Sequence, residues 1–122
     1  MIISNSSTII LIAKITLLPK FLDNVKNVTI TNIVYNEITN KDSFENLTIK
    51  KEIENGRIKV KSVDEKFYST IIKSFKLDEG EASIFALYDK RKHKAILTDD
   101  RELIKLCKIN NIKFIYYICI QL

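Results

Sequence analysis

The sequence predicts a three-layer α/β/α fold, in which a central and mainly parallel sheet of four to five strands lies between two layers of helices. Short apolar runs alternate with amphipathic segments along the whole chain, and this alternation is typical of parallel sheets with helical connections. No change in composition marks a domain boundary within the 122 residues, a length that suits one core. We therefore expect a single domain over residues 1–122.

Each expected strand is a short apolar run bounded by polar residues. The run at residues 58–63 alternates apolar and charged residues, as a half-buried strand does, whereas the run at residues 95–97 is wholly apolar. In chain order, the expected strands are Ile2–Ser4, Val28–Ile30, Ile58–Val63, Ala95–Leu97 and Ile112–Ile120.

The expected helices are marked by residues that favour helix ends. Pro19 suits a first helical turn because its φ is fixed, Asp64 is a preferred N-cap, and Gly56 is a common terminator. The expected helices run from Ser7 to Leu17, from about Pro19, after Thr31 or Asn32, from Ser43 to Asn55, from Glu65 to Phe75, after Asp78 or Glu79, and from Arg101 to Ile109.

Composition limits the classes of function. The formal net charge is +5 and the sequence pI is ≈ 9.2, a balance that favours attraction to any polyanion, RNA and DNA included. Two Gly and one Pro leave no room for a Gly-rich phosphate loop. His93 is the one histidine and lies in the basic run 90–94, so a Ser-His-Asp or Cys-His nucleophile set cannot be assembled.

The sequence predicts a soluble, cytoplasmic protein that does not enter a membrane. Cys107 and Cys119 form neither a metal-ligand spacing nor a disulfide framework, as expected in a reducing compartment. The apolar run Ile9–Leu18 is interrupted by Lys14 and follows no basic region, which is unlike a signal peptide. The run Ile115–Leu122 is too short to span a bilayer.

Oxygen ligands follow two of the expected strands. Asp99 and Asp100 come directly after residues 95–97, Asn5 follows the first strand, and Glu81 stands near a helix start. Because functional groups of parallel sheets gather beyond the carboxyl ends of the strands, we expect these side chains near one another. Carboxylate and amide oxygens are the ligands that hard cations prefer.

Four motifs stand in the order found in PIN-domain proteins. They are NSSTIILIAKITLL, VYNEI, LDEGEASIFAL and AILTDDRELIKLCKINNIKFI, and together they extend from Ile2 to about Ile115. The chain resembles the PIN branch that includes VapC-like ribonucleases of the toxin–antitoxin type. The resemblance implies a PIN-like fold and a metal-dependent endoribonuclease that hydrolyses RNA phosphodiester bonds.

The resemblance also implies roles for single residues around bound Mg²⁺ or Mn²⁺, which would activate a water and stabilise the leaving oxygen. Relatives often read T-x-D, which favours Asp100 as the metal ligand and Asp99 as its neighbour or a second ligand. The implied catalytic residues are Glu37, Glu81, Asp99 and Asp100, and the implied metal ligands are Asn5, Glu37, Glu81 and Asp100.

Contacts with substrate are expected from four further residues. Ser7 and Thr98 resemble family positions that orient acids or phosphate, although either would serve equally as a cap or a strand-end hydroxyl. Lys14 on the first helix and Arg101 behind the Asp pair are candidates for binding RNA phosphates, which fixes position without reading sequence; the simpler interpretation of Lys14 is a solvated residue at the edge of its helix. The basic run 90–94 would also attract RNA, but from the opposite end of the sheet, and its simpler interpretation is a solvated loop.

The acids have simpler interpretations too. Glu81 lies in a first helical turn, where the helix dipole alone favours an acid, and Glu37 would otherwise be a solvated surface residue. One of Asp99 and Asp100 would serve as N-cap of the helix that follows.

Asn5 departs from the family, since PIN nucleases commonly carry Asp at this position. An amide retains a carbonyl ligand but loses a negative charge, which would weaken binding of a divalent ion. Asn5 or Ser6 would also cap the first helix. The alternative function is therefore a catalytically weakened PIN-fold module for RNA binding or protein interaction.

The C-terminal run Phe114–Ile120 is continuously apolar, and relatives usually continue into one more helix, so the domain is expected to be short at this end. A bare apolar strand invites pairing, and the resemblance also implies a homodimer. If the protein is a toxin, a small antitoxin protein would insert into the acidic groove and silence it.

Overall fold

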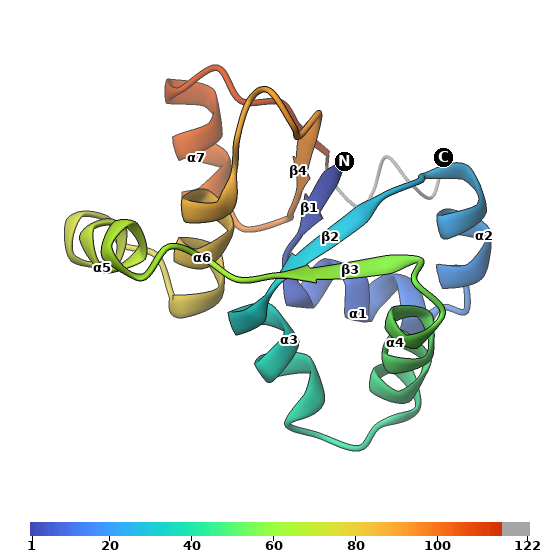
Figure 1. Ribbon diagram of the computed structural model, residues 1–122. Helices are drawn as coiled ribbons and strands as arrows, with labels where there is room; N and C mark the ends of the chain where they lie inside the picture. The colour runs from blue at the N-terminus through green and yellow to red at the C-terminus, as the bar shows by residue number, and fades with distance from the viewer. Residues whose placement is uncertain (116–122) are drawn as a thin grey trace.

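A computed structural model of the chain describes residues 1–115 and contains one sheet of five parallel strands between layers of helices (Figure 1). The strand order is β3-β2-β1-β4-β5. The predicted fold class is therefore confirmed. The strands are β1 (Ile2–Ser4), β2 (Val28–Thr31), β3 (Ile58–Lys61), β4 (Ala95–Leu97) and β5 (Phe114–Ile115). The strand expected at Ile112–Ile120 begins at Phe114, and its part after Ile115 lies outside the described residues.

Side-chain caps set the starts of the helices. In every helix except α2, the side chain of the N-cap accepts a hydrogen bond from a backbone N–H of the first turn, and α2 has Pro19 in its first turn instead. The helices are α1 (Ser6–Lys14), α2 (Leu18–Asn24), α3 (Asn32–Thr39), α4 (Phe44–Glu54), α5 (Glu65–Ser74), α6 (Glu79–Leu87) and α7 (Arg101–Ile109).

Two further expected boundaries differ from the structure by more than one residue. The first helix was expected at residues 7–17 but ends at Lys14, because the chain turns at Thr16, which adopts a left-handed φ of 61°. The strand expected at residues 58–63 ends at Lys61, and its Val60 is 36% exposed rather than buried. The reason is position, since β3 forms an edge of the sheet.

The core fills both faces of the central strands. Ile3, Ile30 and Ile96 are fully buried, as expected for parallel strands covered on both sides. Helix α1 packs against α4, while α6 packs against β2 and α5. Figure 1 shows α1 and α4 together on one side of the sheet and α6 and α7 on the other.

The strand order reverses between β1 and β4. The chain first builds β1, β2 and β3 outward in one direction and then returns to place β4 on the other side of β1. Ser4 pairs with Leu97 in this register, so the residues that follow each strand emerge side by side. In open parallel sheets, ligands bind at this kind of switch point, beyond the carboxyl ends of the strands.

Candidate active site

Asn5 links the ends of β1 and β4. Its side chain is 2% exposed; its Oδ1 accepts a hydrogen bond from the Thr8 backbone N–H at 3.0 Å, and its Nδ2 donates to Thr98 Oγ1 at 2.9 Å. The expected cap of the first helix is thus Asn5 rather than Ser6. Because both ends of the amide have partners, the side chain is held in one orientation at the switch point.

Thr98 orients the segment that follows β4. Its buried hydroxyl oxygen accepts hydrogen bonds from Asn5 Nδ2 and from the Asp100 backbone N–H, the latter at 3.0 Å. A hydroxyl offers two acceptor lone pairs and one proton, so both lone pairs are used here. The strand-end hydroxyl therefore joins Asn5 to the turn that carries the two aspartates.

Asp99 and Asp100 accept hydrogen bonds from different helices. Asp100 caps α7, because its Oδ2 accepts a hydrogen bond from the Leu103 backbone N–H at 2.8 Å. Asp99 is exposed, and its Oδ1 lies 3.2 Å from Ser7 Oγ and 3.4 Å from Thr8 Oγ1 at the start of α1. Asp99, expected as a neighbour of the ligand Asp100 or as a second ligand, is thus the carboxylate that hydrogen-bonds to the first helix.

Glu37 belongs to a second acidic group at the start of α6. A Cβ added to Gly80 would overlap Glu37 Oε1, and Glu37 Cδ would lie 3.2 Å from it, so the carboxylate lies directly over this glycine. Burial, and then the negative charges of Asp78 and Glu79, raise the pKa of Glu37 above its usual value. Glu81 follows in the same helical turn, its backbone N–H donating to Asp78 Oδ1 at 2.9 Å.

Buried hydroxyls fix this second group to the sheet. Thr31 Oγ1 and Ser83 Oγ are 2.6 Å apart, and Ser83 Oγ also donates to the Gly80 carbonyl at 2.6 Å. Thr31 in addition caps α3 through the Val34 backbone N–H. The end of β2, the start of α3 and the first turn of α6 are therefore held together, which sets where Glu37 lies.

The family follows from the whole chain together with this geometry. The model of the DUF3368 family, described as a PIN domain, matches residues 1–120. The chain belongs to the PIN-domain family. The five-stranded parallel sheet with helices on both faces is the PIN-like fold, and PIN domains are generally nucleases that use divalent metal ions.

No curated protein matches this PIN domain. In the described part of the chain, no helix is long and apolar enough to cross a membrane.

The acids of the PIN domain do not form a ready ligand set. Among residues 1–115, no three Asp, Glu, His or Cys side chains lie close enough together to hold a metal ion. Three of the aspartates already accept hydrogen bonds from the protein: Asp78 and Asp100 cap helices, and Asp99 accepts from α1. The donor chemistry suits a hard cation, but Mg²⁺ would need waters or substrate phosphates to complete its shell.

The remaining expected site residues lie in different places. Ser7 hydrogen-bonds to Asp99, and Arg101 lines a shallow hollow of ≈ 300 Å³ together with Asp99. Lys14 is exposed at the far end of α1, about 12 Å from its first turn at 1.5 Å per residue. The structure therefore brings Ser7 and Arg101 to the aspartates and leaves Lys14 apart.

Sequence reasoning missed Ser83 and Gly80. Ser83 is fully buried and connects α6 to β2, and Gly80 is the position over which Glu37 lies. One signal was available, because a serine inside the apolar run 82–86 has to find a buried partner. The resemblance, which implies that Glu37 and Glu81 hold one metal ion, was the signal that could have brought Glu37 to this turn.

Proposed function

We propose that this PIN domain is a metal-dependent endoribonuclease of the VapC-like branch, which hydrolyses phosphodiester bonds in RNA. The observation that carries the proposal is the Asn5–Thr98 hydrogen bond at the switch point of the sheet, with the Asp99 carboxylate beside it. This is the place where an open parallel sheet binds its ligand, and its oxygen donors suit the chemistry of the family.

The proposed roles follow the two acidic groups. Asp99 and Asp100 would act from the β4 side and Glu37 and Glu81 from the α6 side, and Mg²⁺ or Mn²⁺ would be held by Asn5, Glu37, Glu81 and Asp100. When bound, the metal would supply an activated water and neutralise the developing charge. The residues of the chain itself would position the RNA: Ser7 and Thr98 by orienting Asp99 and Asp100, and Arg101 by contacting phosphate.

The test is cleavage of a mixed RNA pool by the purified protein with Mn²⁺ and with EDTA. The variant is Asp99→Asn/Asp100→Asn, in which an asparagine at position 100 keeps the capping function. Glu54→Gln, an exposed carboxylate at the end of α4, is the matched control. Cutting that needs Mn²⁺, persists in the control and is lost in the double variant is expected; cutting that persists in the double variant would contradict the proposal.

A second candidate function is a PIN-fold module that binds RNA or protein without efficient catalysis. Two observations favour it. The Asn5 amide already forms two hydrogen bonds, one as the cap of α1 and one to Thr98. The described residues also contain no set of three close carboxylate, His or Cys ligands. RNA binding in EDTA together with no cleavage in Mn²⁺ would support this function over the first.

The proposed partners follow from the first function. RNA is the substrate, and a small antitoxin protein would bind over the acids at the carboxyl edge of the sheet if the protein is a toxin. We also propose a homodimer in the cytoplasm. The apolar run Phe114–Ile120, on which the dimer was inferred, extends beyond the described residues. Co-purification of a short protein encoded next to this chain would support the toxin role.

A further inference from the structure

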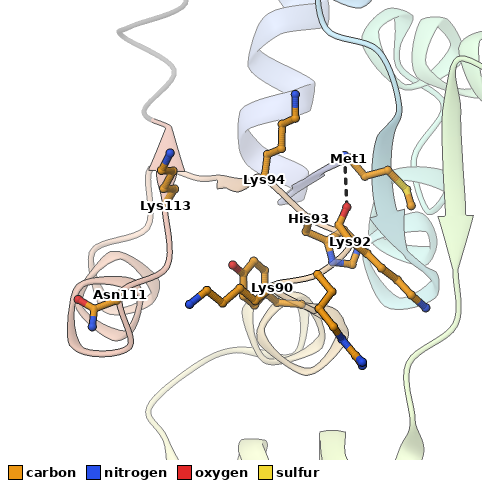
Figure 2. Close-up of a pocket in the computed structure, with 9 residues that line it drawn as sticks. Met1, Lys90, Lys92, His93, Lys94, Asn111 and Lys113 are labelled. Atoms are coloured by element: carbon orange, nitrogen blue, oxygen red, sulfur yellow. Dashed lines mark hydrogen bonds between the residues drawn. The ribbon is translucent and has the colours of Figure 1, made fainter.

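A basic cavity lies at the amino ends of the strands, opposite the candidate active site at their carboxyl ends (Figure 2). It has a volume of ≈ 660 Å³ and lies between the loop that precedes β4 and the turn that precedes β5. No carboxylate is among the described residues that line it. Its polar lining includes Lys90, Arg91, Lys92, Lys94, Asn111 and Lys113.

Most of these cations form no ion pair with the residues that the structure describes, although Asp89 lies near Arg91 and Lys92. Arg91 Nε lies 3.4 Å from Asp89 Oδ1, whereas Lys90, Lys92, Lys94 and Lys113 form no ion pair within residues 1–115. All four lysines are exposed. Like charges gathered around one hollow repel one another and attract an anion, so the cavity is suited to a polyanion.

A row of cations connects this cavity with Asp99. Helix α7 begins beside Asp99, at the carboxyl ends of the strands, and ends at the turn that leads into Lys113, at their amino ends. Lys105 and Lys108 lie on one face of α7 with Arg101, at spacings of four and three residues, and all three line the hollow that contains Asp99. Lys105 also forms an ion pair with Glu102, in which Lys105 Nζ lies 3.5 Å from Glu102 Oε1.

We propose that the basic cavity binds RNA phosphates and holds a strand that reaches the candidate active site along α7. The substrate class rests on the proposed ribonuclease function. The nine residues of α7 span about 13.5 Å at 1.5 Å per residue, which is the length of about four stacked nucleotides at 3.4 Å each. A dinucleotide at Asp99 would therefore be too short to reach the cavity.

The test compares two triple variants that remove the same charge. Lys90→Ala/Lys92→Ala/Lys113→Ala removes lysines of the cavity. Lys20→Ala/Lys51→Ala/Lys59→Ala removes exposed lysines on α2, α4 and β3. Binding of a labelled 12-nucleotide single-stranded RNA and of a labelled dinucleotide is measured by fluorescence anisotropy in EDTA, so that no RNA is cut, at several salt concentrations.

The cavity variant is expected to bind the 12-mer at least about tenfold more weakly than the control variant. Its slope of log affinity against log salt should be lower by about 2, since each phosphate contact with a single strand contributes about 0.7. Dinucleotide binding should be the same in both variants. Equal loss of 12-mer binding in the two variants would overturn the proposal, because only bulk charge would then matter.

Two further outcomes separate the alternatives. If the cavity variant loses binding to poly-glutamate but keeps its affinity for RNA, the site is for an acidic protein and the proposal is wrong. If the cavity variant loses RNA binding while the native chain cuts no RNA in Mn²⁺, the cavity proposal stands and the ribonuclease function fails. Equal melting temperatures of the two variants show that both are folded.

Discussion

At the scale of single residues, the pair Asn5–Thr98 explains how an amide can occupy a position where the resemblance to PIN nucleases leads us to expect a carboxylate. The amide caps α1 with its oxygen and donates to Thr98 with its nitrogen. A carboxylate has no proton to donate, but the Thr98 hydroxyl can rotate and donate to it. The site is therefore compatible with either residue, and the difference between them is one negative charge.

Asn5→Asp tests the importance of that charge. We expect tighter binding of Mn²⁺ and a cleavage rate several-fold higher at limiting Mn²⁺, because a hard cation prefers a carboxylate to an amide. Asn55→Asp, at the exposed end of α4, adds the same charge elsewhere and should have no effect. An Asn5→Asp variant with an unchanged Mn²⁺ dependence would show that position 5 is only a cap.

Thr98→Val tests the buried hydroxyl. The variant leaves Asn5 Nδ2 and the Asp100 N–H without their acceptor, and an unsatisfied buried polar group costs about 1–3 kcal/mol. We expect a fall of this size in the free energy of unfolding, measured with urea, and near-native stability in Thr98→Ser, which keeps the hydroxyl. Equal stability of the valine and serine variants would contradict this account.

His93 is expected to make stability depend on pH. Burial lowers its pKa below the ordinary value of 6.5, and its Nδ1 accepts a hydrogen bond from the Asp89 backbone N–H at 2.9 Å. Well above pH 6.5 the ring is neutral in both states. Below pH 6.5 the unfolded chain takes up the proton first, so the free energy of unfolding falls as the pH falls.

The measurement is urea unfolding at pH 7.5 and 5.5. His93→Asn is the comparison, because its side-chain oxygen can still accept from Asp89 but does not titrate. We expect a smaller loss of stability in His93→Asn than in the native chain, and an identical loss in both would assign the effect to other groups.

At the scale of elements, the start of α6 is built around Gly80. Asp78 caps the helix, Ser83 ties its first turn to Thr31, and the Glu37 carboxylate lies where a Cβ on Gly80 would be. The positive end of a helix favours anions, which offsets part of the repulsion between Glu37 and the acids of α6. A bound cation would offset more of it.

Gly80→Ala should separate activity from stability. Alanine favours a helix by about 1 kcal/mol over glycine, but its Cβ displaces Glu37. We expect RNA cleavage to fall at least about tenfold, to the level of Glu37→Gln, with little loss of stability. Gly56→Ala is the reverse case: at φ +78° an alanine is strained, at about 1 kcal/mol or more, yet cleavage by the folded protein should be unchanged. Full activity of Gly80→Ala would show that Glu37 has no role in cleavage.

At the scale of the whole molecule, the two ends of the strands carry opposite charge. Asp99 and the acids of α6 lie at the carboxyl ends, and the lysines around β4 and β5 lie at the amino ends. A net charge of +5 conceals this separation. This arrangement suits a long RNA strand that binds to the lysines at the amino ends and extends to the acids at the carboxyl ends.

Local sequence signals predicted most of the fold. The cap residues and the alternation of apolar runs indicate strands and helices because both act over a few residues. The gathering of Asn5, Asp99 and Asp100 beyond the carboxyl ends of the strands follows once a parallel sheet is assumed, whereas the strand order β3-β2-β1-β4-β5 came from the structure. The contacts of Glu37 with Gly80 and of Thr31 with Ser83 could not be predicted, since they depend on how α3 and α6 pack, and so the division of the acids into two groups was not foreseen.

The most direct test of the central claim is single-turnover cleavage of one labelled RNA in Mn²⁺ by the native chain, Asp99→Asn and Glu54→Gln. Asparagine can still accept from Ser7 and Thr8, so the change removes charge and little else. We predict that Asp99→Asn cuts at least about a hundredfold more slowly and that Glu54→Gln cuts at the native rate. Native-rate cleavage by Asp99→Asn would mean that the Asp99 carboxylate at the junction of β1 and β4 takes no part in the reaction.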